Sequence, residues 1–275
     1  MTWWALDVRV APERRERVSA WLVAQTGQAI EERDDGTLVT FAESESDAEA
    51  LSVALAWEHG ATATRRAIDP VDWSIRWRDG IEARRFGRLT VTPSWIASGD
   101  ADGPVVVLDP EMAFGSGEHG STRAALALLE RHLAPGDRVL DLGSGSGILA
   151  IAAVKLGAQR ASGVELDEGS NAVALRNAER NGVAGTTAFL QGEAGDLAPL
   201  LGPADLVLSN ILRTVNTLLL RAISASLRPS GIAIFSGMES AEAELFAPEL
   251  AQAGFLAFDQ VDDAGWWAVA ARRGG

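Results

Sequence analysis

Two patterns of apolar and polar positions follow one another along the chain, and the first predicts a small α/β unit. Short alternating segments rich in β-forming residues predict strands, whereas apolar residues on successive turns predict helices. The predicted elements are a strand over residues 3–10, a helix from Pro12, a hairpin of residues 29–32 and 37–41 around Asp34-Asp35-Gly36, a helix from Ser46 or Asp47 to about Glu58, and a strand over residues 62–67. The order β-α-β-β-α-β is that of a ferredoxin-like domain.

The second pattern begins at about Phe86 and alternates short apolar strands with longer helical segments. Strands are predicted over residues 105–108, 138–142, 161–166, 187–191, 204–209, 231–235 and 266–270, and helices over residues 122–132, 147–156, 170–181, 218–226 and 241–253. This alternation predicts a mostly parallel, doubly wound sheet with helices on both faces. The fold class is therefore α/β, with a Rossmann-like domain preceded by a small ferredoxin-like α+β domain.

A connector separates the two units. Asp69-Pro70 ends the last strand of the first unit, and residues 71–77 fit a short helix with Trp73 and Trp77 one turn apart. We expect these tryptophans to pack between the domains rather than to stack on a ligand. The first unit carries no candidate site chemistry, so we expect it to recognise a substrate. The predicted organisation is a recognition domain at residues 1–67, a linker at residues 68–85 and a catalytic domain at residues 86–275.

The composition narrows the location and the class of partner. The chain has 275 residues, no cysteine and a formal net charge of −14 at pH 7. The absence of cysteine excludes disulfides and thiolate nucleophiles. Neither a signal peptide nor a membrane-spanning apolar run is evident, so we expect a cytoplasmic protein. Free nucleic acid is a poor partner for so acidic a chain, whereas a basic macromolecule is attracted by the opposite field.

A glycine-rich loop follows the predicted strand that carries Asp141. Gly143, Gly145 and Gly147 form this loop, and a helix begins directly after it. In a parallel sheet, ligands bind at the carboxyl ends of the strands, where glycines allow close approach to the backbone. Glu165 ends the next strand, about 20 residues further on, at the distance of an acid that accepts hydrogen bonds from ribose hydroxyls. The pattern Asp-x-Gly-x-Gly-x-Gly is typical of S-adenosylmethionine enzymes.

Motifs of other enzyme classes are missing from the sequence. The dinucleotide fingerprint needs a glycine at position 148, where the chain has Ile148. His59, His119 and His132 show no metal-ligand spacing, so we expect no metal site. Neither the nucleophile elbow of the hydrolases nor a phosphate-binding P-loop is present. Methyl transfer requires none of these, because it needs a donor, a neutral nucleophile and in-line geometry.

Four segments together resemble the motifs of one family. Residues 109–122 resemble an F-G-T-G-x-H-x-T-T loop, residues 139–147 a cofactor glycine loop, residues 177–182 a helix end after the ribose acid, and residues 209–212 an A-N-I-L motif. The family with these motifs is that of the PrmA-type ribosomal protein methyltransferases, which trimethylate amino groups of the large-subunit protein numbered eleven. It also has a small amino-terminal recognition domain and a linker, so the resemblance covers nearly the whole chain.

The resemblance implies S-adenosylmethionine as cofactor and assigns several site residues by position. Together with the glycine-loop interpretation, the predicted cofactor-binding set is Phe114, Gly115, Thr122, Asp141, Gly143, Gly145, Glu165 and Asn210, and Asn210 is also the predicted catalytic residue. Phe114 and Gly115 are expected to cover the methionine end of the cofactor. Glu165 stands where the family usually has aspartate, and Arg213 replaces a small residue that we expect near the acceptor amine.

The sequence therefore predicts a methyltransferase for lysine ε-amines of a basic large-subunit ribosomal protein, with an α-amine as a further candidate acceptor. The reference pKa of lysine is about 10.4, so the site must let the ammonium lose its proton, and the side-chain oxygen of Asn210 is suited to orient the amine. Three alternatives stay open. They are a lysine methyltransferase for another protein such as an electron-transfer flavoprotein, a nicotinamide dehydrogenase, which Ile148 disfavours, and an inactive ribosome-binding module, which the intact glycine loop disfavours.

Overall fold

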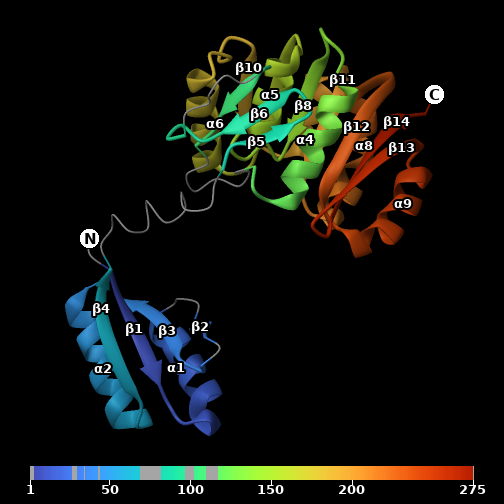
Figure 1. Cartoon of the computed structure of the whole chain (residues 1–275). Helices are drawn as coiled ribbons and strands as arrows, with labels where there is room; N and C mark the ends of the chain where they lie inside the picture. The colour runs from blue at the N-terminus through green and yellow to red at the C-terminus, as the bar shows by residue number, and fades with distance from the viewer. Residues whose placement is uncertain are drawn as a thin grey trace. The chain divides into compact units, whose positions relative to one another are not determined.

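The computed structural model describes residues 3–26, 30–33, 35–42, 44–68, 82–96, 102–109 and 117–274, and Figure 1 shows the whole chain. Contacts divide the chain into two units, Met1–Gly80 and Ile81–Gly275. The division falls inside the predicted linker, residues 68–85, and each unit has a buried core of its own. The predicted helix over residues 71–77, with Trp73 and Trp77, lies outside the described residues.

The first unit confirms the ferredoxin-like fold. Its elements are β1 (Trp3–Arg9), η1 (Pro12–Arg14), α1 (Arg15–Thr26), β2 (Glu31–Glu32), β3 (Leu38–Ala42), α2 (Glu45–His59) and β4 (Thr62–Ile68). The strands form an antiparallel sheet in the order β2-β3-β1-β4. Leu22 of α1 and Leu55 of α2 pack in one cluster with Leu6 and Leu38 of the sheet, so both helices cover the same face.

The beginning of α2 differs from the prediction. Ser44, rather than Ser46 or Asp47, is the residue before the helix, and its hydroxyl oxygen accepts a hydrogen bond from the Asp47 amide at 3.1 Å. A serine two residues earlier satisfies an amide that the first turn would otherwise leave unpaired. The other end of α2 is closed by Gly60 in the left-handed conformation.

The second unit contains a seven-stranded sheet in the order β10-β9-β8-β11-β12-β14-β13. Its strands are β8 (Arg138–Leu142), β9 (Arg160–Glu165), β10 (Thr187–Gln191), β11 (Ala204–Asn210), β12 (Leu227–Glu239), β13 (Phe255–Asp263) and β14 (Trp266–Arg273). The five strands from β10 to β12 are parallel, whereas β14 is antiparallel to both β12 and β13. The Rossmann-like, mostly parallel sheet is therefore confirmed, with one reversed strand near its edge.

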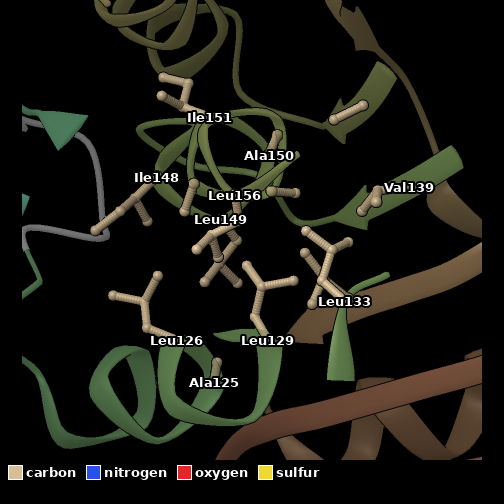
Figure 2. Packing of buried hydrophobic residues seen from close by; sticks show 14 of the residues in the cluster. Ala125, Leu126, Leu129, Leu133, Val139, Ile148, Leu149, Ala150, Ile151 and Leu156 are labelled. Atoms are coloured by element: carbon tan, nitrogen blue, oxygen red, sulfur yellow. The ribbon is translucent and has the colours of Figure 1, made fainter. Parts of the chain in front are cut away.

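Helices cover both faces of this sheet (Figure 1). They are α4 (Gly120–His132), α5 (Ile148–Leu156), α6 (Glu168–Arg180), α7 (Ala194–Leu201), α8 (Arg213–Ser226), the short η2 (Ser240–Glu242) and α9 (Ala243–Gln252). One apolar cluster joins α4 and α5 to the sheet, and a second joins α7, α8 and α9 to its opposite face. Figure 2 shows Leu126 and Leu129 of α4 pointing toward Leu149 of α5 within the first cluster.

A smaller sheet of β5 (Arg84–Phe86), β6 (Leu89–Thr92) and β7 (Val105–Val107) packs on the first cluster. Asn181, next to the end of α6, holds β7. Its side-chain oxygen accepts from the Val107 amide at 2.8 Å, and its side-chain nitrogen donates to the Val107 carbonyl at 2.6 Å. Of this sheet the sequence predicted only β7. Within the described part of the chain, no helix is long and apolar enough to cross a membrane.

Candidate active site

A cavity of about 540 Å³ lies at the carboxyl edge of the seven-stranded sheet. Its lining follows the strand order from one side of the sheet to the other, through Glu193 after β10, Glu165 of β9, Gly143 after β8, Asn210 of β11, Gly237 of β12 and Trp266 of β14. Trp266 begins β14, but because that strand is antiparallel it pairs with Glu239, the last residue of β12. Ligands of such sheets bind at this edge. The cavity is therefore the candidate site.

The backbone of the glycine loop forms part of the cavity wall. Gly143 has φ +73°, and a Cβ there would lie 2.5 Å from Cγ2 of Ile211. Gly147 has φ +80°, and a Cβ there would lie 2.8 Å from Cζ of Phe189. A residue with a Cβ at either position would be strained by the positive φ and would clash with the neighbouring side chain. The loop can therefore approach a ligand closely at Gly143 and Gly145, which both line the cavity.

Glu165 lines the cavity and supports the glycine loop at the same time. One carboxylate oxygen accepts from the Gly145 amide at 2.9 Å, and the other accepts from the amides of Leu166 and Asp167 at 2.8 and 3.2 Å. A carboxylate has about four acceptor positions, so about one remains. Two ribose hydroxyls would therefore need the bond from Gly145 to be released. Asp167 caps α6, because its side chain accepts from the Ser170 amide at the start of that helix.

Asp141 lies beneath the glycine loop and does not line the cavity. It is buried in β8, and one of its oxygens accepts from the Ala150 amide of α5 at 3.0 Å. Its other oxygen has no hydrogen-bond partner within the described structure. Burial, and secondarily the charge of Glu165, raises the pKa of Asp141 to about 7. The geometry makes it a support of the loop, and its predicted contact with a cofactor stays a prediction.

The raised pKa of Asp141 predicts a pH dependence of stability. The folded state keeps the proton to about pH 7, whereas the unfolded state releases it near the ordinary aspartate pKa of 3.8. Between these values the folded state binds more protons, so its stability falls as the pH rises. Asp141→Asn removes this titration. We expect the melting temperature of the wild type to fall relative to that of Asp141→Asn between about pH 5 and about pH 8. Parallel melting curves across this range would contradict the assignment.

Asn210 lines the cavity and has a buried side-chain oxygen that is unpaired within the described structure. Its side-chain nitrogen donates to the hydroxyl of Thr122 at 3.2 Å, and its buried side-chain oxygen has no partner among the described residues. Thr122 is fully buried in the first turn of α4 and does not line the cavity. Thr122 therefore orients the amide of Asn210. A contact between Thr122 and a cofactor stays a prediction.

Asn216 is a functional neighbour that sequence reasoning missed. This fully buried residue of α8 accepts a hydrogen bond from the Ser209 hydroxyl at 2.6 Å and donates to the carbonyls of Ile211 and Ser236 at 2.9 and 3.0 Å. It therefore fixes the chain on both sides of Asn210. The sequence feature that could have identified Asn216 is its place on the apolar face of a helix. A buried amide needs hydrogen-bond partners, so an asparagine there indicates a buried network.

Glu193, His119 and Trp266 are among the further lining residues that were missed. Glu193 lies two residues after the predicted strand over residues 187–191, so the strand-end rule would have found it. His119 and Trp266 line the other end of the cavity, with their ring centroids 4.2 Å apart. Burial, and secondarily the charge of Arg123, lowers the pKa of the His119 imidazole.

The predictions for Phe114, Gly115 and Arg213 stay predictions. Phe114 and Gly115 lie outside the described residues. Arg213 does not line the cavity, although its neighbour Leu212 does. It begins α8 and forms ion pairs with Glu242 at 3.2 Å and Glu249 at 3.5 Å, so its charge is neutralised toward α9 instead.

Comparisons with known proteins agree with one another. A protein-family model described as "Ribosomal protein L11 methyltransferase (PrmA)" matches residues 38–274. The ribosomal protein L11 methyltransferase of Pelotomaculum thermopropionicum is 39% identical over 214 residues, which are 77% of this chain and 69% of that protein. The protein of the same name from Pseudomonas paraeruginosa is 33% identical over 99% of both chains.

A solved structure is similar over the larger part of the chain. The crystal structure of ribosomal protein L11 methylase from Lactobacillus delbrueckii subsp. bulgaricus superposes with a TM-score of 0.64 and 30% sequence identity. The superposition covers 70% of this chain and 100% of that one.

Proposed function

The chain belongs to the ribosomal protein L11 methyltransferase (PrmA) family, and on this premise we propose that it transfers methyl groups from S-adenosylmethionine to lysine ε-amines of ribosomal protein L11 in the cytoplasm. An α-amine is a further candidate acceptor. The observation that carries the proposed lysine chemistry is that Asn210, which lines the cavity, has a side-chain oxygen without a hydrogen-bond partner among the described residues. The formal net charge of −14 also suits a basic protein substrate.

The residues of the cavity fit the cofactor. S-adenosylmethionine, when bound, supplies a methyl group on a positively charged sulfonium. Gly143 and Gly145 offer the close backbone approach, and Glu165 is the acid for the ribose hydroxyls. Glu193 lies after β10, the strand next to β9, and lines the same cavity. Its carboxylate would be an acceptor for the adenine amino group. The sulfonium end would then extend along the sheet edge toward Asn210.

Asn210 is proposed to orient the acceptor amine. A lysine ammonium must lose a proton before it can attack, and apolar surroundings such as Ile211 and Leu212 favour the neutral amine. The Asn210 oxygen can accept one remaining N–H, which turns the nitrogen lone pair toward the methyl group. Asn210 cannot itself take the proton at neutral pH, so it acts by orientation.

Glu165→Ala is expected to weaken S-adenosylmethionine binding by at least about tenfold. A hydrogen bond to a charged group is worth about 1.5–3 kcal/mol, and about 1.4 kcal/mol corresponds to tenfold in affinity. Titration calorimetry on the folded variant measures the effect. Glu165→Asp is the matched control, because it keeps the charge on a shorter arm and should stay within a few-fold of the wild type. Unchanged affinity in Glu165→Ala would remove Glu165 from the cofactor site.

The proposed function is tested by methyl transfer to a panel of purified proteins. We expect label from S-adenosylmethionine carrying a labelled methyl group to appear on ribosomal protein L11, and not on an electron-transfer flavoprotein or on free nucleic acid. Label on the flavoprotein alone would assign the chain to another protein substrate. Binding of a nicotinamide cofactor, with no transfer of label to any protein, would contradict the whole assignment.

A further inference from the structure

We propose that Trp266 and His119 form the acceptor end of the cavity, where the ring of Trp266 holds the lysine nitrogen as it gains successive methyl groups. This inference rests on the proposed function and adds to it a subsite that sets how many methyl groups are transferred. Both rings are positioning groups. They position the substrate nitrogen and take no part in proton transfer or in bond breaking.

The strand order places these rings beyond Asn210. Along the sheet edge, Glu165 of β9 and Asn210 of β11 are separated by the glycine loop after β8, whereas Trp266 of β14 lies two strands beyond β11 on the other side. A cofactor held at Glu165 with its sulfonium toward Asn210 leaves the end at Trp266 for the other reactant. His119, in the loop before α4, lines the same end.

The two rings form one wall. Their centroids are 4.2 Å apart and their planes are inclined at 58°. Nδ1 of His119 lies 2.7 Å from the hydroxyl of Ser121, which also lines the cavity. A Cβ at Gly120 would lie 2.7 Å from Cδ1 of Trp266, so the backbone of α4 approaches the indole closely. The wall is thus packed from behind, and its rings have little freedom to move apart.

Arg123 clamps the two segments that carry the rings. Its guanidinium donates to both carboxylate oxygens of Asp263 at 2.9 and 2.6 Å, three residues before Trp266. It also donates to the carbonyl of Glu118, the residue before His119. The Glu118 carboxylate in turn accepts from Nε of Arg84 at 2.9 Å. Bidentate pairs of this kind fix geometry as well as charge, so both segments are held in one arrangement.

The chemistry of repeated methylation explains why an aromatic wall would be useful. In each transfer the nitrogen lone pair forms the new N–C bond, and the electron pair of the S–C bond stays on the sulfur. A proton leaves the nitrogen for solvent before the next transfer. Every added methyl group removes an N–H, so the Asn210 oxygen loses its donor as methylation proceeds. An aromatic face attracts the positive charge that develops on the alkylated nitrogen as each N–C bond forms, and it needs no N–H to do so. The contribution of Trp266 therefore persists to the last transfer.

The test compares Trp266→Leu and Trp266→Phe with the wild type on ribosomal protein L11. Mass spectrometry after equal total methyl transfer gives the proportions of singly, doubly and triply methylated lysine. We expect Trp266→Leu to slow the second and third transfers relative to the first by about tenfold. Trp266→Phe keeps a ring and should give nearly the wild-type proportions. Trp267→Phe is the matched control, because Trp267 packs near Phe246 in the core cluster instead.

Wild-type proportions in Trp266→Leu would overturn the proposal, and so would a wild-type enzyme that adds only one methyl group to each lysine. An equal shift in Trp266→Phe would also overturn it, because loss of indole packing rather than of the aromatic face would then be the cause. No transfer by the wild-type chain would overturn the proposed function itself, which separates the two failures.

Discussion

Asn210→Ala is expected to lower turnover by about a hundredfold while the affinity for the protein substrate changes little. The oxygen of Asn210 is the polar atom that the structure leaves unpaired at the end of β11, beside the cavity. Without it, the amine can still enter but is no longer held with its lone pair toward the methyl group. Steady-state kinetics on ribosomal protein L11, with a separate binding measurement, give the two quantities.

Thr122→Val is the companion variant. It removes the hydroxyl that accepts from the Asn210 side chain at 3.2 Å but keeps the shape of the residue in the core. Its turnover should fall less than that of Asn210→Ala, because the oxygen is still present but less well oriented. If Asn210→Ala retains full turnover and only binds the protein substrate more weakly, Asn210 belongs to recognition and the proposed orienting role is wrong.

Removal of residues 1–80 is expected to abolish methylation of intact ribosomal protein L11 and to leave cofactor binding nearly unchanged. The residues that line the cavity belong to the second unit. The core cluster of the first unit is separate from the two clusters on the faces of the seven-stranded sheet. A protein substrate is larger than a cavity of about 540 Å³. A second binding surface, on the first unit, can therefore contribute most of the affinity for the protein substrate.

The deletion is interpretable only in a folded chain, so circular dichroism and a melting curve come first. Calorimetry with S-adenosylmethionine and methyl transfer to intact L11 are then measured on the same preparation. Full activity on intact L11 would show that the first domain is not the recognition element. Lost cofactor binding in the folded truncation would show that both domains contribute to one site.

The sequence was sufficient for the longer elements of both units and for the position of Glu165 at the end of a strand. Strand β8 is buried from Val139 to Leu142, and β9 is buried at Ala161, Gly163 and Val164, so the ends of these strands at Leu142 and Glu165 were predicted within one residue. The glycine spacing located the cavity, because only glycine fits where Gly143 meets Ile211. These features are set by local sequence, and tertiary contacts only complete them.

Other elements depend on contacts that no local pattern reports. Strand β13 runs along the sheet edge with exposed, polar residues such as Gln260 and Asp262, so it lacks an apolar alternation. Helix α7 contains Pro199 and is only eight residues long, and β5 and β6 have three and four residues. These segments are stabilised by packing on the larger elements.

The same limit applies to the site. The wall of His119 and Trp266 joins residues far apart in the sequence, and the hydrogen bonds of Asn216 reach Ser236 on a neighbouring strand. Thr122 was predicted from a motif, but its contact with Asn210 required the fold to bring α4 beside β11. Motifs therefore identified residues at the site, whereas the partners of each residue came from the structure.

The central claim is that this cavity transfers methyl groups to lysine ε-amines of ribosomal protein L11. The most direct measurement is tandem mass spectrometry of unmodified L11 after incubation with the purified chain and S-adenosylmethionine, with Asn210→Ala in parallel. We predict mass increments of whole methyl groups on lysine side chains with the wild type, and greatly reduced increments with the variant at equal time. Unmodified lysines with the wild type, or methyl groups confined to other residue types, would contradict the account.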